Sequence, residues 1–191
     1  MSTSDYSKGI DETEELRASK LSQLAKAVAA LDKAKTQNYR DAQSICPHLL
    51  DDQHHLMFLR CERWDVDLAS LRLAKYWDER VALFGPKAFL PLTPDEALRD
   101  DGTAASLGIF NALPGRDEEG RSIIWVDASS FPSAKSDTPT RESICRYMWY
   151  VFHTALENVD AQKHGVVTLF FNSSPMKLNQ FDRKRMEVII R

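Results

Sequence analysis

Histidine and cysteine side chains are the first candidates for chemistry in this sequence, because both ligate metals and both act in catalysis. Cys46, His48, His54 and His55 lie close together in the chain. Their spacing matches no common zinc arrangement, and adjacent histidines on a helix point to different sides. A solvated helix surface is the preferred interpretation, and we expect no metal. The three cysteines form no CxxC pair, which favours reduced thiols in the cytosol.

The remaining nucleophiles and bases do not combine into a catalytic group. Ser173 and Ser174 follow an apolar run, but no base stands at a readable spacing from them. His153 lies in an aromatic segment, where a packed or hydrogen-bonded histidine is expected. The common phosphate-binding, hydrolase and metalloprotease motifs are absent from the sequence. We therefore predict a non-enzymatic protein without a cofactor. A small α/β enzyme is the least supported alternative, with Asp127 as its one titrating group at a strand end.

The composition describes a folded protein that is nearly balanced in charge. Of its 191 residues 43% are hydrophobic and 28% are charged, which is too apolar for a disordered chain. The net charge of -3 and the lack of a basic run predict no nucleic-acid partner. No apolar stretch reaches the roughly 18 residues that would cross a bilayer. We expect a cytoplasmic monomer that touches membranes only peripherally.

The first half of the chain has a helical pattern. We expect residues 1–10 to be a disordered tail and residues 11–90 to form an all-helical N-terminal lobe. Apolar side chains recur there at spacings of three to five residues, with Asp51 and Asp65 as predicted helix caps. Gly85 and the proline after it end the last of these helices, because glycine accepts a left-handed conformation and proline cannot continue a helix.

The second half changes to strands and helices. Residues 107–112 are a candidate short strand, and the apolar runs 122–127 and 166–171 are firmer ones, separated by a predicted helix over 138–161. Strand, helix, strand is the βαβ order, so we expect the two firm strands to be parallel and the fold class to be α/β.

Two further patterns lie at the borders of this half. Thr93 to Glu96 is a capping-box sequence that predicts a short helix reaching Asp101. Residues 179–191 have a helical pattern without a stop signal. Because a stable sheet usually has three or more strands, we expect residues 91–191 to be only part of a binding lobe, with further strands beyond Arg191.

Three motifs follow one another in a fixed order. Phe58–Asp67 reads FLRCERWDVD, Arg116–Arg121 reads RDEEGR before an apolar strand, and Gly165–Val167 opens the next strand. Over about residues 42–191 this series resembles the CRAL-TRIO lipid-binding family, which includes the alpha-tocopherol and phosphatidylinositol transfer proteins. The chain departs from the family pattern at Met57, Glu62, Ser122 and Phe171.

The resemblance implies a deep apolar cavity in the α/β lobe that holds one hydrophobic lipid and exchanges it at a membrane surface. The candidate cavity residues are Ile123, Trp125, Tyr147, Val151, Val167, Leu169 and Phe171. The apolar arc of the helix around Tyr147 is unusually wide, and a central core helix would explain it equally well.

Arg60 and Arg63 are the candidates for contacts with a lipid head group, since the resemblance places the arginine of the FLR segment in a basic region. The alternative for Arg60 is an ion pair with the neighbouring acidic helix, for example with Asp78 or Glu79.

The functional expectation is binding of a lipid or phosphoinositide and its transfer between membranes. A lipid-sensing regulatory or scaffolding protein, in which no transfer occurs, is the alternative. Movement of a bound lipid between vesicles separates the two.

Overall fold

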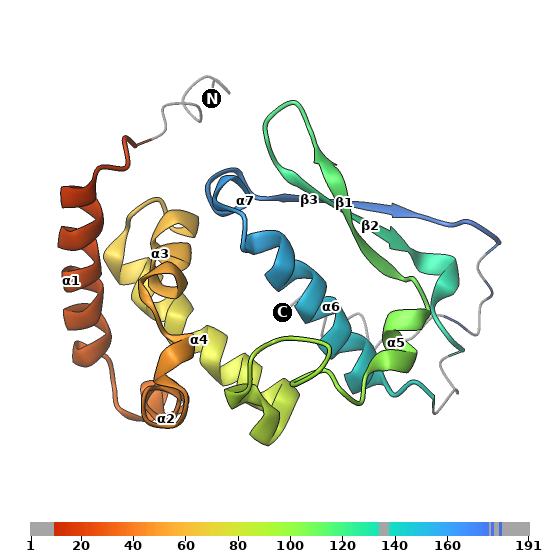
Figure 1. Ribbon diagram of the computed structural model, residues 1–191, viewed down its shortest axis with the longest axis horizontal. Coiled ribbons are helices and arrows are strands. Elements are labelled where there is room, and N and C mark those ends of the chain that lie inside the picture. Colours follow the sequence, from red (N-terminus) through yellow and green to blue (C-terminus); the bar gives the residue numbers. More distant parts are fainter. Residues whose placement is uncertain (1–9, 134–137, 176, 178–179, 181–191) are drawn as a thin grey trace. The chain divides into compact units, whose positions relative to one another are not determined.

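The computed structural model describes residues 10–133, 138–175, 177 and 180, so the predicted C-terminal helix over 179–191 lies outside the described residues except for Gln180 (Figure 1). The chain divides into two compact units, Met1–Trp77 and Asp78–Arg191. The division falls inside helix α4 (Val66–Phe84), upstream of the boundary that the sequence suggests.

The first unit is all helical, as the sequence predicts. Its elements are α1 (Glu14–Ala30), η2 (Ala34–Thr36), α2 (Gln37–Ile45), η3 (Pro47–Leu49), α3 (Asp52–Cys61) and the beginning of α4. Both predicted caps are confirmed. The Asp51 carboxylate accepts a hydrogen bond from the backbone N–H of His54 at 2.8 Å, and the Asp65 carboxylate accepts one from Leu68 at 3.0 Å. These side chains satisfy N–H groups that the first turn of a helix leaves without a partner.

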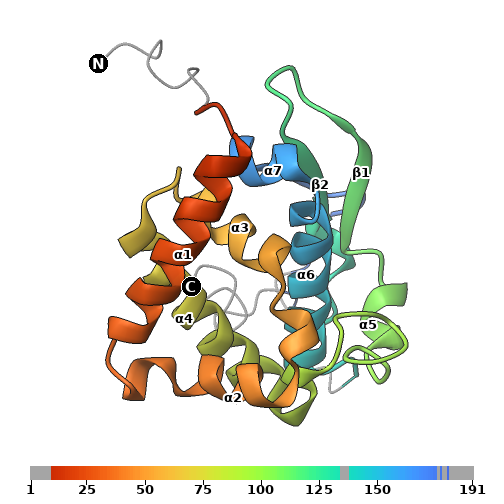
Figure 2. The same ribbon diagram turned by 60° about the vertical axis from the view of Figure 1, so that its left-hand side comes forward.

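The core of the first unit forms where the apolar stripes of its helices meet. Figures 1 and 2 both show α1 running beside α3. Leu24 of α1, Leu59 of α3 and Leu73 of α4 are at most 1% exposed. Three separate helices thus bury their periodic leucines in one interior, which is the main source of stability for helices of this length.

The second unit contains the sheet. Its elements are η4 (Gly85–Phe89), α5 (Gly102–Ser106), β1 (Phe110–Arg116), β2 (Ser122–Asp127), η5 (Ala128–Ser130), α6 (Arg141–Leu156), α7 (Val159–His164) and β3 (Val166–Phe171). The sheet order is β1-β2-β3, with β1 and β2 antiparallel and β2 and β3 parallel. The predicted parallel pairing is therefore confirmed.

A glycine and an aspartate shape the turn between β1 and β2. Gly120 takes a φ of 79°, a left-handed value that glycine adopts without strain. The Asp117 carboxylate accepts hydrogen bonds from the backbone N–H of Arg121 at 2.8 Å and from its guanidinium at 2.6 Å. Glycine and this local ion pair together close the hairpin.

Two helix predictions for this unit are wrong in detail. Residues 94–100 form consecutive turns and no helix, although the Thr93 hydroxyl donates to the Glu96 carboxylate at 3.0 Å. The predicted helix over 138–161 is two helices, because Asn158 caps α7 and so restarts the chain after α6. In both places a local cap is present, but packing decides how the chain continues beyond it.

Helix α6 packs on one face of the sheet and forms the main core of this unit (Figure 1). The buried residues of this cluster are Ala104, Ile109, Phe110, Ile124, Val126, Ile144, Val151 and Ala155. An ion pair fixes α6 to the segment before α5. The Arg146 guanidinium donates to both carboxylate oxygens of Asp101, at 2.7 and 2.8 Å, and Asp101 is only 1% exposed. Such a bidentate ion pair fixes both the position and the angle of the two side chains relative to each other.

His153 lies on α6 with its side chain 21% exposed. Burial lowers its pKa from 6.5 to about 4, and the positive charge of Arg80 adds to this shift. The unfolded chain therefore takes up a proton near pH 6.5 that the folded chain resists until about pH 4. The stabilising contribution is complete above pH 6.5 and is lost as the pH falls from there toward 4.

We predict that the free energy of unfolding falls by at most about 3 kcal/mol between pH 7 and pH 4 because of His153. Denaturant unfolding across this range should show a shallower pH dependence for His153→Phe, which cannot titrate. His48→Phe is the matched control, because His48 is exposed. Equal slopes for His153→Phe and the unmodified chain would contradict the prediction.

Candidate functional site

Strands β2 and β3 each place side chains on both faces of the sheet, because successive side chains of a strand point to opposite sides. The parallel register pairs Ile123 with Val167 and Trp125 with Leu169. Paired residues share a face, so one side of the sheet carries Ile123, Trp125, Val167, Leu169 and Phe171. We call these five residues the open face. They include five of the seven predicted cavity residues.

The open face is apolar and partly accessible. Trp125 is 37% exposed and Leu169 is 46% exposed, while the other three side chains are half-buried. The rings of Trp125 and Phe171 lie against each other with centroids 3.9 Å apart. Accessible apolar side chains gathered on one surface are typical of a ligand or partner site. The strand pattern thus builds a continuous apolar strip across two strands.

The other two predicted cavity residues, Tyr147 and Val151, lie on α6 and therefore on the opposite side of the sheet. Val151 is 5% exposed and packs in the same cluster as Ile124 and Val126. Tyr147 is half-buried, and burial raises the pKa of its hydroxyl. The structure does not bring these two side chains together with the open face.

The wide apolar arc of α6 has a structural explanation in its two neighbours. One side of the helix packs on the sheet, as Val151 shows. Another side, through Tyr147, Trp149 and Tyr150, packs on a second cluster of Phe84, Ala88, Ala97 and Leu98. A helix that contacts two clusters needs more apolar surface than one that covers a single core.

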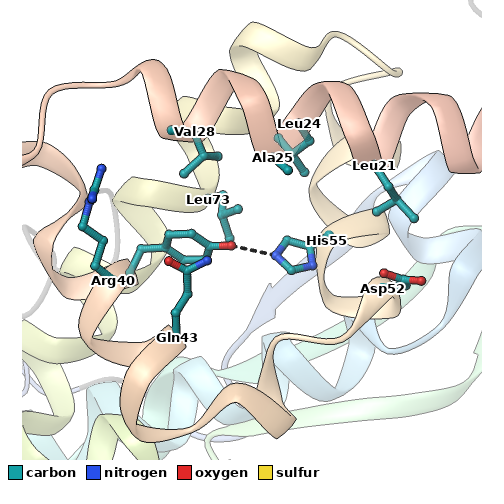
Figure 3. A pocket seen from close by; sticks show the side chains of 11 residues that line it. Leu21, Leu24, Ala25, Val28, Arg40, Gln43, Asp52, His55 and Leu73 are labelled. Atoms are coloured by element: carbon teal, nitrogen blue, oxygen red, sulfur yellow. Dashed lines mark hydrogen bonds between the residues drawn. The ribbon is translucent and has the colours of Figure 1, made fainter.

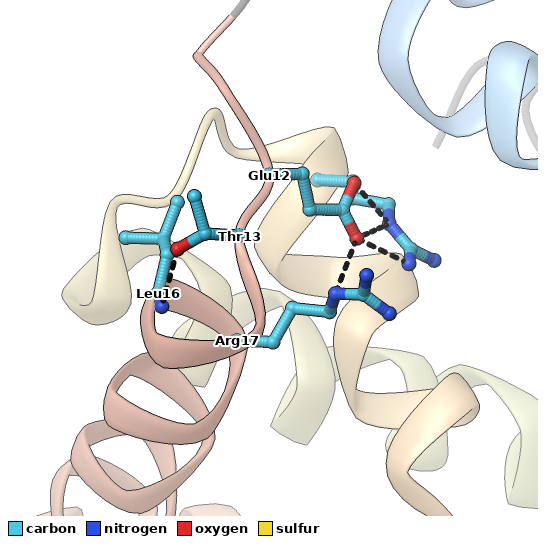
Figure 4. Close-up of polar contacts among 5 residues, drawn as sticks. Glu12, Thr13, Leu16 and Arg17 are labelled. Atoms are coloured by element: carbon cyan, nitrogen blue, oxygen red, sulfur yellow. Dashed lines mark hydrogen bonds and ion pairs between the residues drawn. The ribbon is translucent and has the colours of Figure 1, made fainter.

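Arg60 lies in the first unit, and its guanidinium forms an ion pair with a carboxylate. Its side chain is 3% exposed and donates from Nη2 to Glu12 Oε1 at 2.6 Å and from Nε to the same oxygen at 3.1 Å. Glu12 also pairs with Arg17 at 3.5 Å (Figure 4). Glu12 precedes α1, 48 residues away from Arg60 in the chain. In this structure, Glu12 takes the place that a phosphate head group would need.

Arg63 stands in the connection between α3 and α4 and is exposed. It has a φ of 51°, and Trp64 after it has a φ of 67°. Two consecutive left-handed residues without glycine are uncommon. Trp64 is buried and its backbone N–H donates to Leu59 O at 2.6 Å, which helps to hold this conformation.

Asp127 anchors a polar cluster at the carboxyl ends of β2 and β3. Its carboxylate accepts from the Ser129 hydroxyl at 2.6 Å, from the Ser173 hydroxyl at 2.5 Å and from the Ser130 hydroxyl at 3.1 Å. Burial alone would raise the pKa of Asp127, but hydrogen bonds from Ser129 and Ser173 outweigh it and hold the pKa well below its usual range. Such a carboxylate is a poor proton acceptor, so it is badly suited to activate a serine.

Two of the clustered histidines, His54 and His55, take part in ring contacts and hydrogen bonds. The ring of His54 lies among Phe58, Tyr76 and Trp77, and it accepts a hydrogen bond from the Trp77 indole at 3.3 Å. Within the part of the chain that the structure describes, no group of three or more His, Cys, Asp or Glu side chains is arranged to hold a metal ion. The described helices include none that is long and apolar enough to cross a membrane.

Fold and open face together define an α/β module in which β2 packs one apolar face under α6 and leaves the other face partly accessible. Residues 108–191 match the model of the CRAL/TRIO domain family. This part of the chain therefore resembles a CRAL/TRIO domain, and the match supports lipid binding in general. No curated protein matches the chain.

We predict that Glu12→Gln destabilises the chain by about 2 kcal/mol or more, because it leaves the charge of Arg60 buried without this carboxylate. Urea unfolding measures the change. Glu14→Gln is the matched control, since Glu14 is exposed in the first turn of α1. It should change the free energy of unfolding by less than about 0.5 kcal/mol. Equal stability of the two variants would refute a stabilising role for the buried pair.

Proposed function

We propose that this chain binds a hydrophobic lipid against the open face and moves it between membranes without catalysing a reaction. The observation that carries the proposal is the accessible apolar strip of Trp125, Leu169 and Phe171 inside the part of the chain that resembles a CRAL/TRIO domain. The proposed carrier is a cytoplasmic monomer that touches membranes peripherally while it loads and unloads.

Apolar contact is the proposed source of affinity. Each buried methylene contributes about 0.8 kcal/mol, so an acyl or isoprenoid chain laid along the strip would be held without a polar contact. The opposite face of β2 is filled by its own side chains, since Ile124 and Val126 are at most 1% exposed. A ligand therefore has one side of this strand available to it.

In this proposal a head-group contact contributes less to lipid affinity than the hydrocarbon does. Arg60, the residue that the family resemblance favours for a phosphate, is already paired with Glu12. A phosphoinositide would have to replace that carboxylate or use Arg63, which is exposed. We therefore propose that the hydrocarbon part of the lipid dominates recognition.

We base the proposed absence of catalysis on the hydrogen bonds that Asp127 accepts. This carboxylate stands at the strand ends, where many α/β enzymes place catalytic groups, but its oxygens accept hydrogen bonds from Ser129 and Ser173. The hydroxyl of Ser173 lies between this carboxylate and the Ser129 hydroxyl, and among the described residues its hydrogen bonds include none to a histidine.

Leu169→Asp should lower lipid occupancy at least about tenfold, because it places a carboxylate against the hydrocarbon. Native mass spectrometry of the chain after incubation with extracted cellular lipids measures occupancy. Leu68→Asp is the matched control, because Leu68 is 51% exposed on α4 and Leu169 is 46% exposed. The control should carry as much lipid as the unmodified chain.

A chain that emerges from this incubation without any lipid would overturn the proposal. Transfer is tested separately, by following a fluorescent lipid from donor to acceptor vesicles. Lipid that binds but does not move would favour the sensing alternative over a carrier.

A further inference from the structure

A pocket lies within the helical unit, and its lining contains none of the open-face residues. It opens between α1, α2 and α3 and has a volume of about 330 Å³ (Figure 3). Leu21, Leu24, Ala25 and Val28 of α1 form one wall, and Leu73 of α4 adds to the apolar lining. These residues all belong to the first unit, so the pocket is complete within it.

Two polar side chains that line this pocket, Tyr39 and His55, are paired with each other. His55 Nδ1 lies 2.8 Å from the carbonyl oxygen of Asp51, so Nδ1 carries the proton and donates it. His55 Nε2 then accepts from the Tyr39 hydroxyl at 2.8 Å. Burial lowers the pKa of His55, which keeps the ring neutral. The middle of the pocket therefore presents a satisfied, uncharged pair.

Charge is found only toward the ends of the row of lining side chains that Figure 3 displays, with Arg40 at one end and Asp52 at the other. Arg40 is half-buried, and its Nε donates to the Thr36 hydroxyl at 3.1 Å. Among the described residues, Arg40 forms no ion pair with a carboxylate. A guanidinium without a counter-charge at the end of an apolar pocket favours an anionic group on a ligand.

We propose that this pocket binds a small amphiphile with an apolar tail and a single anionic head, such as a medium-chain fatty carboxylate. The tail lies along Leu21, Leu24 and Val28, and the head contacts Arg40. Asp52 sets the orientation, because it repels an anion from the opposite end. The volume is on the order of ten times that of a water molecule and falls at the small end of ligand pockets. A whole phospholipid is too large for it.

Isothermal titration calorimetry of the 191-residue chain with decanoate tests the proposal. One decanoate per chain should bind, and Ala25→Phe should weaken binding at least about tenfold by filling the pocket. Ala18→Phe is the matched control, since Ala18 is exposed on the same helix and does not line the pocket. If Ala25→Phe does not fold, Gln43→Trp fills the pocket from α2 instead.

Two further variants test whether the anionic head group contacts Arg40. Arg40→Gln should weaken decanoate about tenfold and leave its uncharged analogue decanol unaffected, because only the ionic contact is lost. Lys26→Gln, which removes an exposed charge from α1 outside the pocket, should change neither.

Leu169→Asp distinguishes this site from the proposed lipid face. Decanoate binding that survives this substitution and fails in Ala25→Phe supports the pocket, whatever the outcome for cellular lipids. Decanoate binding that is absent, that is unchanged in the pocket variants, or that is lost in Leu169→Asp would overturn the proposal.

Discussion

Packing of α6 on one face of the sheet is the constraint on which the second unit depends. Ile124 and Val126 alternate with Ile123 and Trp125 along β2, so sealing one pair under the helix turns the other pair to the opposite side. In a strand with a single apolar face, the second face would carry polar side chains. This strand is apolar on both faces, so a hydrophobic ligand fits its second face.

Polar groups near this sheet are consistent with a structural use. Asp127 gathers the hydroxyls of Ser129, Ser130 and Ser173 and so joins η5 to the chain after β3. Asp101 and Arg146 join the start of α5 to α6. Buried polar atoms that hold one another in this way fix the geometry of the sheet ends and leave the apolar strip as the accessible surface.

Local signals in the sequence predicted local structure well. The caps at Asp51 and Asp65 and the left-handed Gly85 each depend on residues a few positions apart. The parallel order of β2 and β3 also follows from the alternation of strand and helix. Residues that share a face of one strand were equally predictable, because the period of a strand is two.

Long-range partners could not be predicted from the same signals. Periodicity showed that α6 is apolar around a wide arc, but it could not show that Val151 packs on the sheet and that Trp149 packs on a separate cluster. The counter-charge of Arg60 is Glu12, which no spacing rule connects with it. The pocket beside Tyr39 and His55 needs four helices to meet, and a single amphipathic pattern does not specify that meeting.

The position of Glu12 has a consequence for where this fold begins. The first residue of α1 is Glu14, yet the carboxylate that pairs with the guanidinium of Arg60 on α3 comes from Glu12, just ahead of that helix. Trimming the chain to its first helical residue would retain every described helix and β-strand but would remove the carboxylate that pairs with the buried Arg60. The structural border of the helical unit is therefore set by electrostatics, and it lies at least as far upstream as Glu12.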